Sequence, residues 1–396
     1  MSAPAPSNRP RVAVLLSGRE QFSPYFGGAL ARWTYEVYSR ITDKFDVVVF
    51  GFPTEKKDLY PFRHESSEVW RVCSWLAHIP LARRYEETLW LRALIRRLRE
   101  FAVVHIHNRP QWVGTLRKMG YEGAVVLHLH NDHLGHWSAP ALNALAAQVN
   151  AVAVCSNYLK STFVLKSAAL QAKTRVVLNG ANLQVFFPRE EIREPKTIFF
   201  VGRFDPQKGV LQLLQAYEKV LETHPDAKLV VGGSSSFGSH HETEYVRQVR
   251  ELAQRLVERR HAQVHFTGYL DHEKDLPAWF QKATIFACPS LFQEPFGMVN
   301  AEAMACATTV VAANRGGIPE AIGEAGRLVD PENVNEFAAT ISELLSHPQD
   351  RKRLGYMGYE RCRKMFDWAV TAENWAELLD LVANSATSAT TVARRR

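Results

Sequence analysis

Short apolar runs alternate with helical patterns along this chain, and the alternation begins anew in its second half. Residues 11–16 and 45–50 are strand-sized apolar runs, and 29–40 between them has the spacing of a helix. The second half repeats the pattern with apolar runs at 197–201 and 285–288. Strands that alternate with helices predict a parallel sheet with both faces covered. The fold class we expect is α/β, with two doubly wound, Rossmann-like domains that face a central cleft.

A charged stretch among prolines, residues 189–196, divides the two halves and is typical of an interdomain linker. It sets the domain organisation that we expect. In chain order this comprises a disordered N-terminus (1–10), a first Rossmann-like domain (11–188), the linker (189–196), a second Rossmann-like domain (197–365), a C-terminal helix (366–383) and a disordered tail (384–396).

Several classes of protein are excluded or disfavoured by what the sequence lacks. No apolar run approaches the roughly 18–20 residues of a membrane span, and the run after Arg11 is too short for a signal peptide. The five cysteines form no C-x-x-C pair, which indicates reduced thiols in a cytoplasmic protein. The absence of G-x-G-x-x-G disfavours a dinucleotide oxidoreductase, and the absence of a P-loop excludes a P-loop NTPase.

Positive charge is concentrated in the first half of the chain. Residues 1–193 carry 25 Lys and Arg against 15 Asp and Glu, a net charge of +10, whereas the remainder has a net charge of −3. This asymmetry indicates an anionic partner or simply a solvated basic surface. The segment from Leu81 to Phe101 is dense in arginine and has an apolar stripe at helical spacing. Two interpretations stay open: contact with an anionic membrane surface, or a stripe packed on the sheet with its arginines in water.

The most specific pattern lies in residues 289–305, which follow the strand at 285–288 and lead into a helix. Two carboxylates flank a Pro-Phe-Gly turn, Glu294 in the loop and Glu302 in the helix. A carboxylate there can accept hydrogen bonds from sugar hydroxyls. The helix start offers free backbone N–H groups that favour an anion such as phosphate; they belong to Gly297, Met298 and Val299.

Two cations, Arg203 and Lys208, follow the strand at 197–201 directly. At the carboxyl edge of a sheet they could stabilise negative charge on a phosphate group without a metal ion. On spacing alone, a pair of solvated loop residues is the better explanation.

Histidines gather at the ends of two predicted strands, at His105, His107, His128, His130, His133 and His136. Alternate positions on a strand place both rings on one face, so a metal site has to be considered. Carboxylates nearby are few, chiefly Asp132. We therefore expect no metal site.

The segment 289–305 resembles the E-x7-E motif of glycosyltransferase family four, which comprises retaining enzymes with the GT-B fold. Residues 202–209 are similar to the family's phosphate-binding loop, and 314–320 to its Gly-Gly-x-Pro-Glu segment. Residues 179–188 and 155–159 also fit, so the resemblance extends over most of the chain.

The resemblance implies a retaining, metal-independent transfer of a sugar from a nucleotide-diphosphate sugar to an acceptor hydroxyl. A UDP-sugar is the favoured donor and GDP-mannose the next, the acceptor being a lipid-linked or polysaccharide-precursor glycan. No cofactor and no nucleic acid are expected, and the protein could lie peripherally on the inner face of the membrane. Two alternatives stay open: a nucleotide-sugar 2-epimerase and a non-catalytic protein that binds nucleotide-sugars.

The resemblance also assigns roles to the domains and to single residues. It implies that the first domain binds the acceptor, that the second binds the nucleotide-sugar donor, and that the C-terminal helix crosses back to the first domain. The catalytic residues it implies are His130, Arg203, Lys208 and Glu294. The residues expected to bind the donor are Gly27, Gly28, Arg203, Lys208, Gly268, Tyr269, Leu270, Glu294, Phe296, Gly297, Met298, Val299 and Glu302. The candidates for acceptor binding are His107, Asn131 and Asp132.

Overall fold

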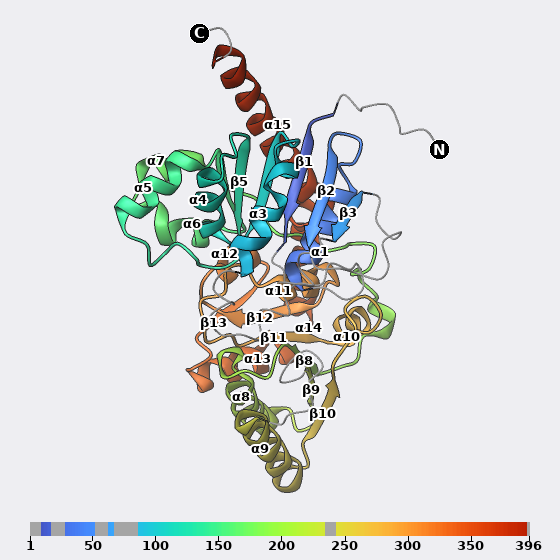
Figure 1. Cartoon of the computed structure of the whole chain (residues 1–396). Helices are drawn as coiled ribbons and strands as arrows, with labels where there is room; N and C mark the ends of the chain where they lie inside the picture. Colours follow the sequence, from blue (N-terminus) through green and yellow to red (C-terminus); the bar gives the residue numbers. More distant parts are fainter. Residues whose placement is uncertain (1–8, 17–27, 52–61, 67–85, 234–242, 394–396) are drawn as a thin grey trace. The chain divides into compact units, whose positions relative to one another are not determined.

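The computed structural model describes residues 9–16, 28–51, 62–66, 86–233 and 243–393. The chain divides into two units (Figure 1). The first comprises Met1–Leu178 and Trp368–Arg396, and the second Asn179–Asp367. Each unit is described separately.

Seven strands of the described chain form a wholly parallel sheet in the first unit, in the order β3-β2-β1-β4-β5-β6-β7. The central strands are buried along their whole length, because helices cover both faces of the sheet. The strands are β1 (Arg11–Leu15), β2 (Asp46–Gly51), β3 (Arg63–Ser66), β4 (Val103–His107), β5 (Ala124–Leu129), β6 (Ala151–Val154) and β7 (Thr174–Val176).

The helices of the first unit lie in two layers. One layer includes α1 (Ala29–Ser39) and α15 (Trp368–Ala393), which pack against each other over β4 and β5. The other includes α3 (Glu86–Leu98) and α4 (Pro110–Lys118), with α4 packed against α5 (Ala139–Gln148). Two shorter helices, α6 (Asn157–Val164) and α7 (Ala168–Lys173), are capped by the hydroxyls of Ser156 and Ser167.

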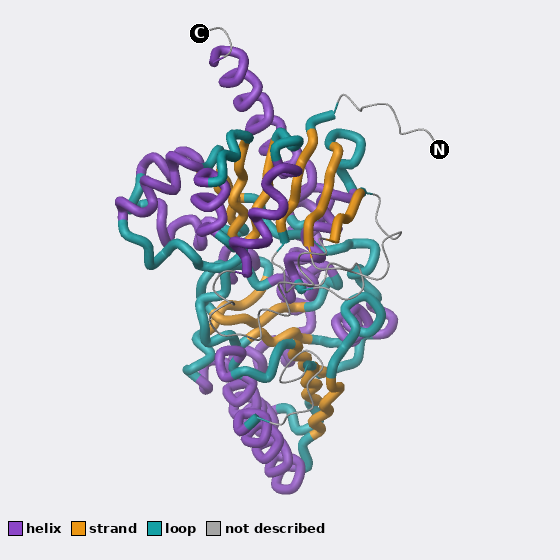
Figure 2. The backbone as a smooth tube through the Cα atoms, in the orientation of Figure 1, coloured by secondary structure: helices purple, strands orange, loops and turns teal. Residues whose placement is uncertain are grey.

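The described residues of the second unit include a six-stranded parallel sheet, in the order β10-β9-β8-β11-β12-β13. In Figure 2 the strands are drawn in orange and the surrounding helices in purple. Here too the central strands are continuous apolar runs, which is typical of a sheet covered on both faces. The strands are β8 (Thr197–Val201), β9 (Lys228–Gly232), β10 (Gln263–Gly268), β11 (Ile285–Cys288), β12 (Thr309–Ala313) and β13 (Gly326–Val329).

Helices cover both faces of the second sheet. One group packs together around Leu213, Leu214 and Tyr217: α8 (Val210–Thr223), α9 (Glu244–Arg260) and α13 (Val334–Ser346). The other group packs around α11, and comprises α10 (Leu276–Lys282), α11 (Met298–Ala305), α12 (Ile318–Ile322) and α14 (Pro348–Met365). Two short 3-10 helices, η3 (Glu190–Ile192) and η4 (Pro206–Lys208), lie in loops.

The predicted fold class is confirmed, since both units are doubly wound parallel sheets. No helix in the described ranges has the length and hydropathy needed to cross a membrane. The four cysteines of the described chain are free thiols; Cys73 lies outside it.

The unit boundaries differ from the predicted domain boundaries. The division falls between Leu178 and Asn179, so the predicted linker at 189–196 belongs to the second unit. Its Arg193 explains why, because the guanidinium donates hydrogen bonds to the carbonyls of Ala283 and Cys306. A charged segment bonded in this way is part of the domain surface.

The C-terminal helix differs in length. We expected it to end at residue 383 and a disordered tail to follow, but α15 continues to Ala393. The alanines in this stretch favour helix, which offsets the weaker propensity of its serines and threonines. The N-terminal stretch 1–10 lies almost wholly outside the described residues.

Candidate active site

The strand order of the second sheet reverses at β8, which lies between β9 and β11. Loops that leave two such strands diverge to opposite faces, and ligands of doubly wound sheets bind at this point. Here the two loops are joined, because the N–H of Leu291 donates to the carbonyl of Gln207 at 2.7 Å. Gly209 has φ 71°, and a Cβ there would lie 2.0 Å from the Pro289 carbonyl oxygen. Only glycine permits this approach.

Lys208 and Glu294 form an ion pair across these two loops. The Ser290 hydroxyl donates to the same carboxylate at 3.0 Å, and the Lys208 ammonium lies 5.0 Å from the centre of the Phe292 ring. The side chain of Lys208 is 22% exposed and that of Glu294 is 14% exposed. Both groups are therefore held in place and still accessible to a ligand. Two predicted catalytic residues, 86 positions apart, are thus in direct contact.

The Gly-Gly segment after β12 holds the backbone of Glu294. Gly317 donates its N–H to the Glu294 carbonyl at 2.7 Å. Gly316 has φ 62°, and a Cβ there would lie 2.2 Å from the same oxygen. The segment therefore supports the Glu294 loop and leaves the carboxylate free to interact elsewhere.

The start of α11 follows the same loop. Gly297 precedes the helix with φ 81°, and the N–H groups of Met298 and Val299 have no acceptor within the helix. Phe296 is buried, edge-on to Phe366 at 5.4 Å between ring centres. Its ring therefore anchors the turn, whereas the helix start presents donors for an anion.

Glu302 lies one turn further along α11 and is 3% exposed. Its carboxylate accepts from Nε2 of His272 at 2.7 Å. Sequence reasoning missed His272, which lies two residues after Leu270, the last of the three residues at 268–270 predicted to bind the donor. Its place after this loop was the only signal in the sequence, and it does not identify Glu302 as the partner.

The loop Gly268-Tyr269-Leu270 ends β10 at the same edge of the sheet. Gly268 has φ 71° and accepts from the N–H of Gly233 at 2.8 Å. Tyr269 is 63% exposed, so its ring does not cap the core. Arg203, after β8, is likewise exposed. The donor residues predicted in the second unit thus lie in the loops after β8, β10 and β11, at the end of β10 and in α11.

A thiol next to this site is chemically inert. Cys288 ends β11 and is buried, and burial together with the nearby Glu294 carboxylate raises its pKa to about 12. At neutral pH it remains protonated, and a covalent thiolate mechanism is disfavoured.

The first unit contains a second group of predicted residues at the ends of β4 and β5. His130 Nε2 lies 3.1 Å from His107 Nδ1, and its backbone N–H donates to the Asn108 side chain at 2.7 Å. Burial, with a smaller contribution from His133, lowers the pKa of His130 to about 3. The imidazole is therefore neutral at physiological pH.

The other predicted residues of this unit are placed as follows. His107 is fully buried, so it supports His130 and has no surface for direct contact with an acceptor. Asn131 and Asp132 are exposed, and the Asp132 carboxylate accepts from the Gly135 N–H at 2.6 Å. Gly28 precedes α1, whereas Gly27 lies outside the described residues.

The arginine-dense segment forms α3 and the turn after it. Its Leu91 and Leu98 are fully buried, so the apolar stripe packs in the first unit. Trp90 is buried as well, and residues 81–85 lie outside the described chain. Three arginines of this segment have exposed side chains: Arg92, Arg96 and Arg99.

Two family descriptions match this chain, "Glycosyltransferase Family 4" at residues 26–185 and "Glycosyl transferases group 1" at residues 184–361. Among curated relatives, spore coat protein SA of Bacillus subtilis is 29% identical over 92% of this chain and 97% of its own length. Alpha-maltose-1-phosphate synthase of Mycolicibacterium smegmatis is 31% identical over 70% of this chain and 78% of its own length.

Solved structures share the fold. Sucrose-phosphate synthase of Thermosynechococcus elongatus superposes with a TM-score of 0.73 at 22% identity, covering 95% of this chain and 100% of its own. HepE of Anabaena, solved in complex with UDP and glucose, superposes with a TM-score of 0.70 at 19% identity. The match covers 93% of this chain and 99% of HepE.

Proposed function

This chain belongs to glycosyltransferase family 4, and on that premise we propose that it transfers a sugar from a UDP-sugar to an acceptor hydroxyl, with retention and without a metal ion. The observation that carries the proposal is the Lys208–Glu294 pair at the reversal of the second sheet, beside the start of α11. It combines a cation for a diphosphate, a carboxylate for a sugar and free N–H donors at one edge.

The leaving group is stabilised by groups fixed before it departs. As the bond to the sugar breaks, negative charge grows on the diphosphate, and Lys208 and Arg203 supply positive charge next to it. The N–H groups of Met298 and Val299 donate hydrogen bonds to the phosphate from the positive end of the α11 dipole. On donor binding, Lys208 exchanges its contact with Glu294 for the phosphate, which releases the carboxylate toward the sugar hydroxyls.

Retention follows from attack on the face from which the diphosphate leaves. The departing phosphate oxygen takes the proton of the acceptor hydroxyl, so that the chain need not supply a nucleophile. Glu294 stabilises the positive charge that develops on the sugar ring. His130, which is neutral, hydrogen-bonds a sugar hydroxyl and does not act as an acid.

UDP is favoured because HepE is solved with UDP and with UDP-glucose. Relatives named D-inositol 3-phosphate glycosyltransferase and alpha-maltose-1-phosphate synthase support an activity of the glycosyltransferase type. For this chain we propose a glycan or lipid-linked acceptor, because the exposed arginines of the first unit suit an anionic molecule.

The proposal predicts that UDP-sugars raise the Tm more than GDP-sugars, since a ligand that binds the native state stabilises it by mass action. With donor and a panel of glycan and lipid-linked acceptors, UDP release is expected at the same rate in EDTA as without it. Thermal shift and a coupled UDP assay measure the two effects.

Four results would contradict this prediction. Dependence of turnover on added Mg²⁺ or Mn²⁺ contradicts metal independence, and a larger Tm rise with GDP-mannose contradicts the choice of base. Conversion of the donor to its 2-epimer without acceptor identifies an epimerase, and binding without turnover over the whole panel identifies a non-catalytic binder.

We further propose that α3 and the turn after it contact anionic membranes by charge alone, because the apolar stripe of α3 is buried in the first unit. Arg92, Arg96 and Arg99 should each contribute about 1 kcal/mol to binding of an anionic bilayer. Wild-type protein is expected to co-sediment with phosphatidylserine vesicles and to be released by salt. Changing all three arginines to glutamate should abolish co-sedimentation.

The matched control reverses three exposed arginines of α9: Arg255, Arg259 and Arg260. It changes the net charge equally but on the other unit. Equal loss of binding in both variants would show that total charge, rather than α3, is responsible, and equal recovery with neutral vesicles would refute the proposal.

A further inference from the structure

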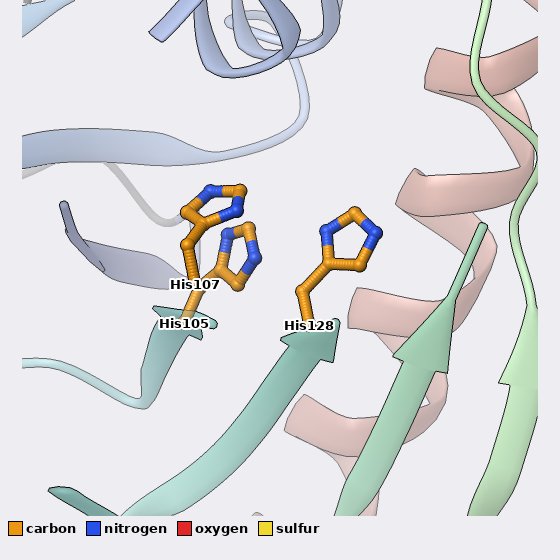
Figure 3. Close-up of side chains that lie close together, drawn as sticks. All are labelled: His105, His107 and His128. Atoms are coloured by element: carbon orange, nitrogen blue, oxygen red, sulfur yellow. The ribbon is translucent and has the colours of Figure 1, made fainter. Parts of the chain in front are cut away.

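Three buried histidines of the first unit lie on one side of two neighbouring strands (Figure 3). His105 and His107 alternate along β4, and His128 on β5 is the register partner of His107. Each is 0% exposed. One ring nitrogen from each histidine lies within 4.8 Å of the corresponding nitrogens of the other two.

Several of these nitrogens lack a hydrogen-bond partner among the described residues. They are Nε2 of His105 and both ring nitrogens of His128. A buried polar atom without a partner loses the hydrogen bonds it made to water, and native structures rarely leave one so. An imidazole with both nitrogens unpaired therefore indicates that something besides the protein occupies this place.

The surrounding residues prepare these histidines to act as ligands. Burial lowers the pKa of all three well below 6.5, so they are neutral and keep a lone pair for coordination. The Tyr38 hydroxyl lies 2.9 Å from His105 Nδ1 and accepts from Trp375 Nε1 at 3.0 Å. When Nδ1–H of His105 donates to this oxygen, the lone pair is on Nε2, as in histidines bound to metals.

We propose that His105, His107 and His128 bind one divalent transition-metal ion, with Zn²⁺ as the probe. Three neutral imidazoles are a known zinc ligand set that leaves the fourth position of a tetrahedron open. The absence of oxygen ligands from this described cluster disfavours Mg²⁺, Ca²⁺ and Mn²⁺. His107, bonded to Thr34 and His130, exchanges one of these two contacts for the ion.

The ion is structural. It joins β4 to β5 beneath α1 and α15, whose Trp33 and Trp375 rings lie 4.5 Å and 5.0 Å from the His128 ring. The ion itself contacts no substrate, because its three ligands are fully buried. The Lys208–Glu294 pair lies in the other unit. Removing the ion is expected to lower the Tm.

The test uses protein freed of any polyhistidine tag, expressed with zinc supplementation and dialysed. Wild type is expected to retain about one zinc ion per chain, and a variant with both His105→Gln and His128→Gln none. The matched control, His347→Gln, removes an exposed histidine and should keep the ion. Refolding wild type with Zn²⁺ at 100-fold its Kd should raise the Tm by about 5 °C or more.

Tyr38→Phe keeps all three histidines and tests the site if the double variant fails to fold. Loss of the supporting hydroxyl should weaken zinc binding about ten- to a hundredfold, as measured by chelator competition. Refolding with Co²⁺ should give the visible absorption of a tetrahedral ion. Zinc-free wild type that refolds with the same Tm with and without Zn²⁺, and gives no such Co²⁺ spectrum, would overturn the proposal in favour of buried water.

Discussion

Replacing Glu294 by alanine is expected to lower kcat by about ten- to a hundredfold, the equivalent of one charge-assisted hydrogen bond of ~1.5–3 kcal/mol. The carboxylate interacts most strongly with a ring that gains positive charge, so its loss acts on the transition state more than on donor binding. Steady-state kinetics should therefore show a fall in kcat with a smaller change in KM. Glu294→Gln should be milder if hydrogen bonding dominates and equally severe if charge does.

The Lys208–Glu294 contact adds a second criterion. Because the two groups are paired, the effects of Lys208→Met and Glu294→Ala on kcat/KM should not add in the double variant. Lys196 and Asp226 provide a matched control. They form an ion pair just before the amino ends of β8 and β9, whereas the candidate site lies at the carboxyl ends. Asp226→Ala should leave kcat unchanged. A near wild-type kcat/KM for Glu294→Ala would show that the loop before α11 has no role in the transfer and only leads into the helix.

The central strands of both sheets could be predicted from sequence because they are continuous apolar runs. β8 and β11 have the predicted bounds. The edge strands β3 and β7 were missed, since Arg63–Ser66 is polar and Thr174–Val176 has only three residues. An edge strand buries little, and its sequence therefore carries a weak hydrophobic signal.

In the candidate site, the parts that are contiguous in sequence could be predicted, whereas the contacts between residues far apart in sequence could not. The loop of Glu294 and the start of α11 are contiguous in sequence, so their motif could be found there. The contacts of Glu294 with Lys208 and of Glu302 with His272 join residues 86 and 30 positions apart. Only the folded sheet brings these loops to one edge, and no spacing in the chain predicts either pair.

Glu302→Ala should mainly raise the KM for donor, by about ten- to a hundredfold. We propose that this carboxylate binds the vicinal hydroxyls of the ribose, which are the same in ground and transition states, so that kcat should change little. His272 holds Glu302 through one hydrogen bond of 2.7 Å and follows residues 268–270, which are predicted to bind the donor. His272→Ala should therefore raise the same KM, by a smaller factor, while kcat is preserved.

His272→Gln separates positioning from mere packing. A glutamine amide can donate to the Glu302 carboxylate, and it should recover part of the donor affinity that alanine loses. His265→Gln is the matched control, because His265 is an exposed histidine of β10 close in sequence to the same loop. Donor KM and kcat are measured for all four variants, with Tm as the check on folding. If Glu302→Ala and His272→Ala lower kcat and spare KM, then this pair serves the reacting sugar, and the division of labour between the two glutamates is the reverse of the one proposed.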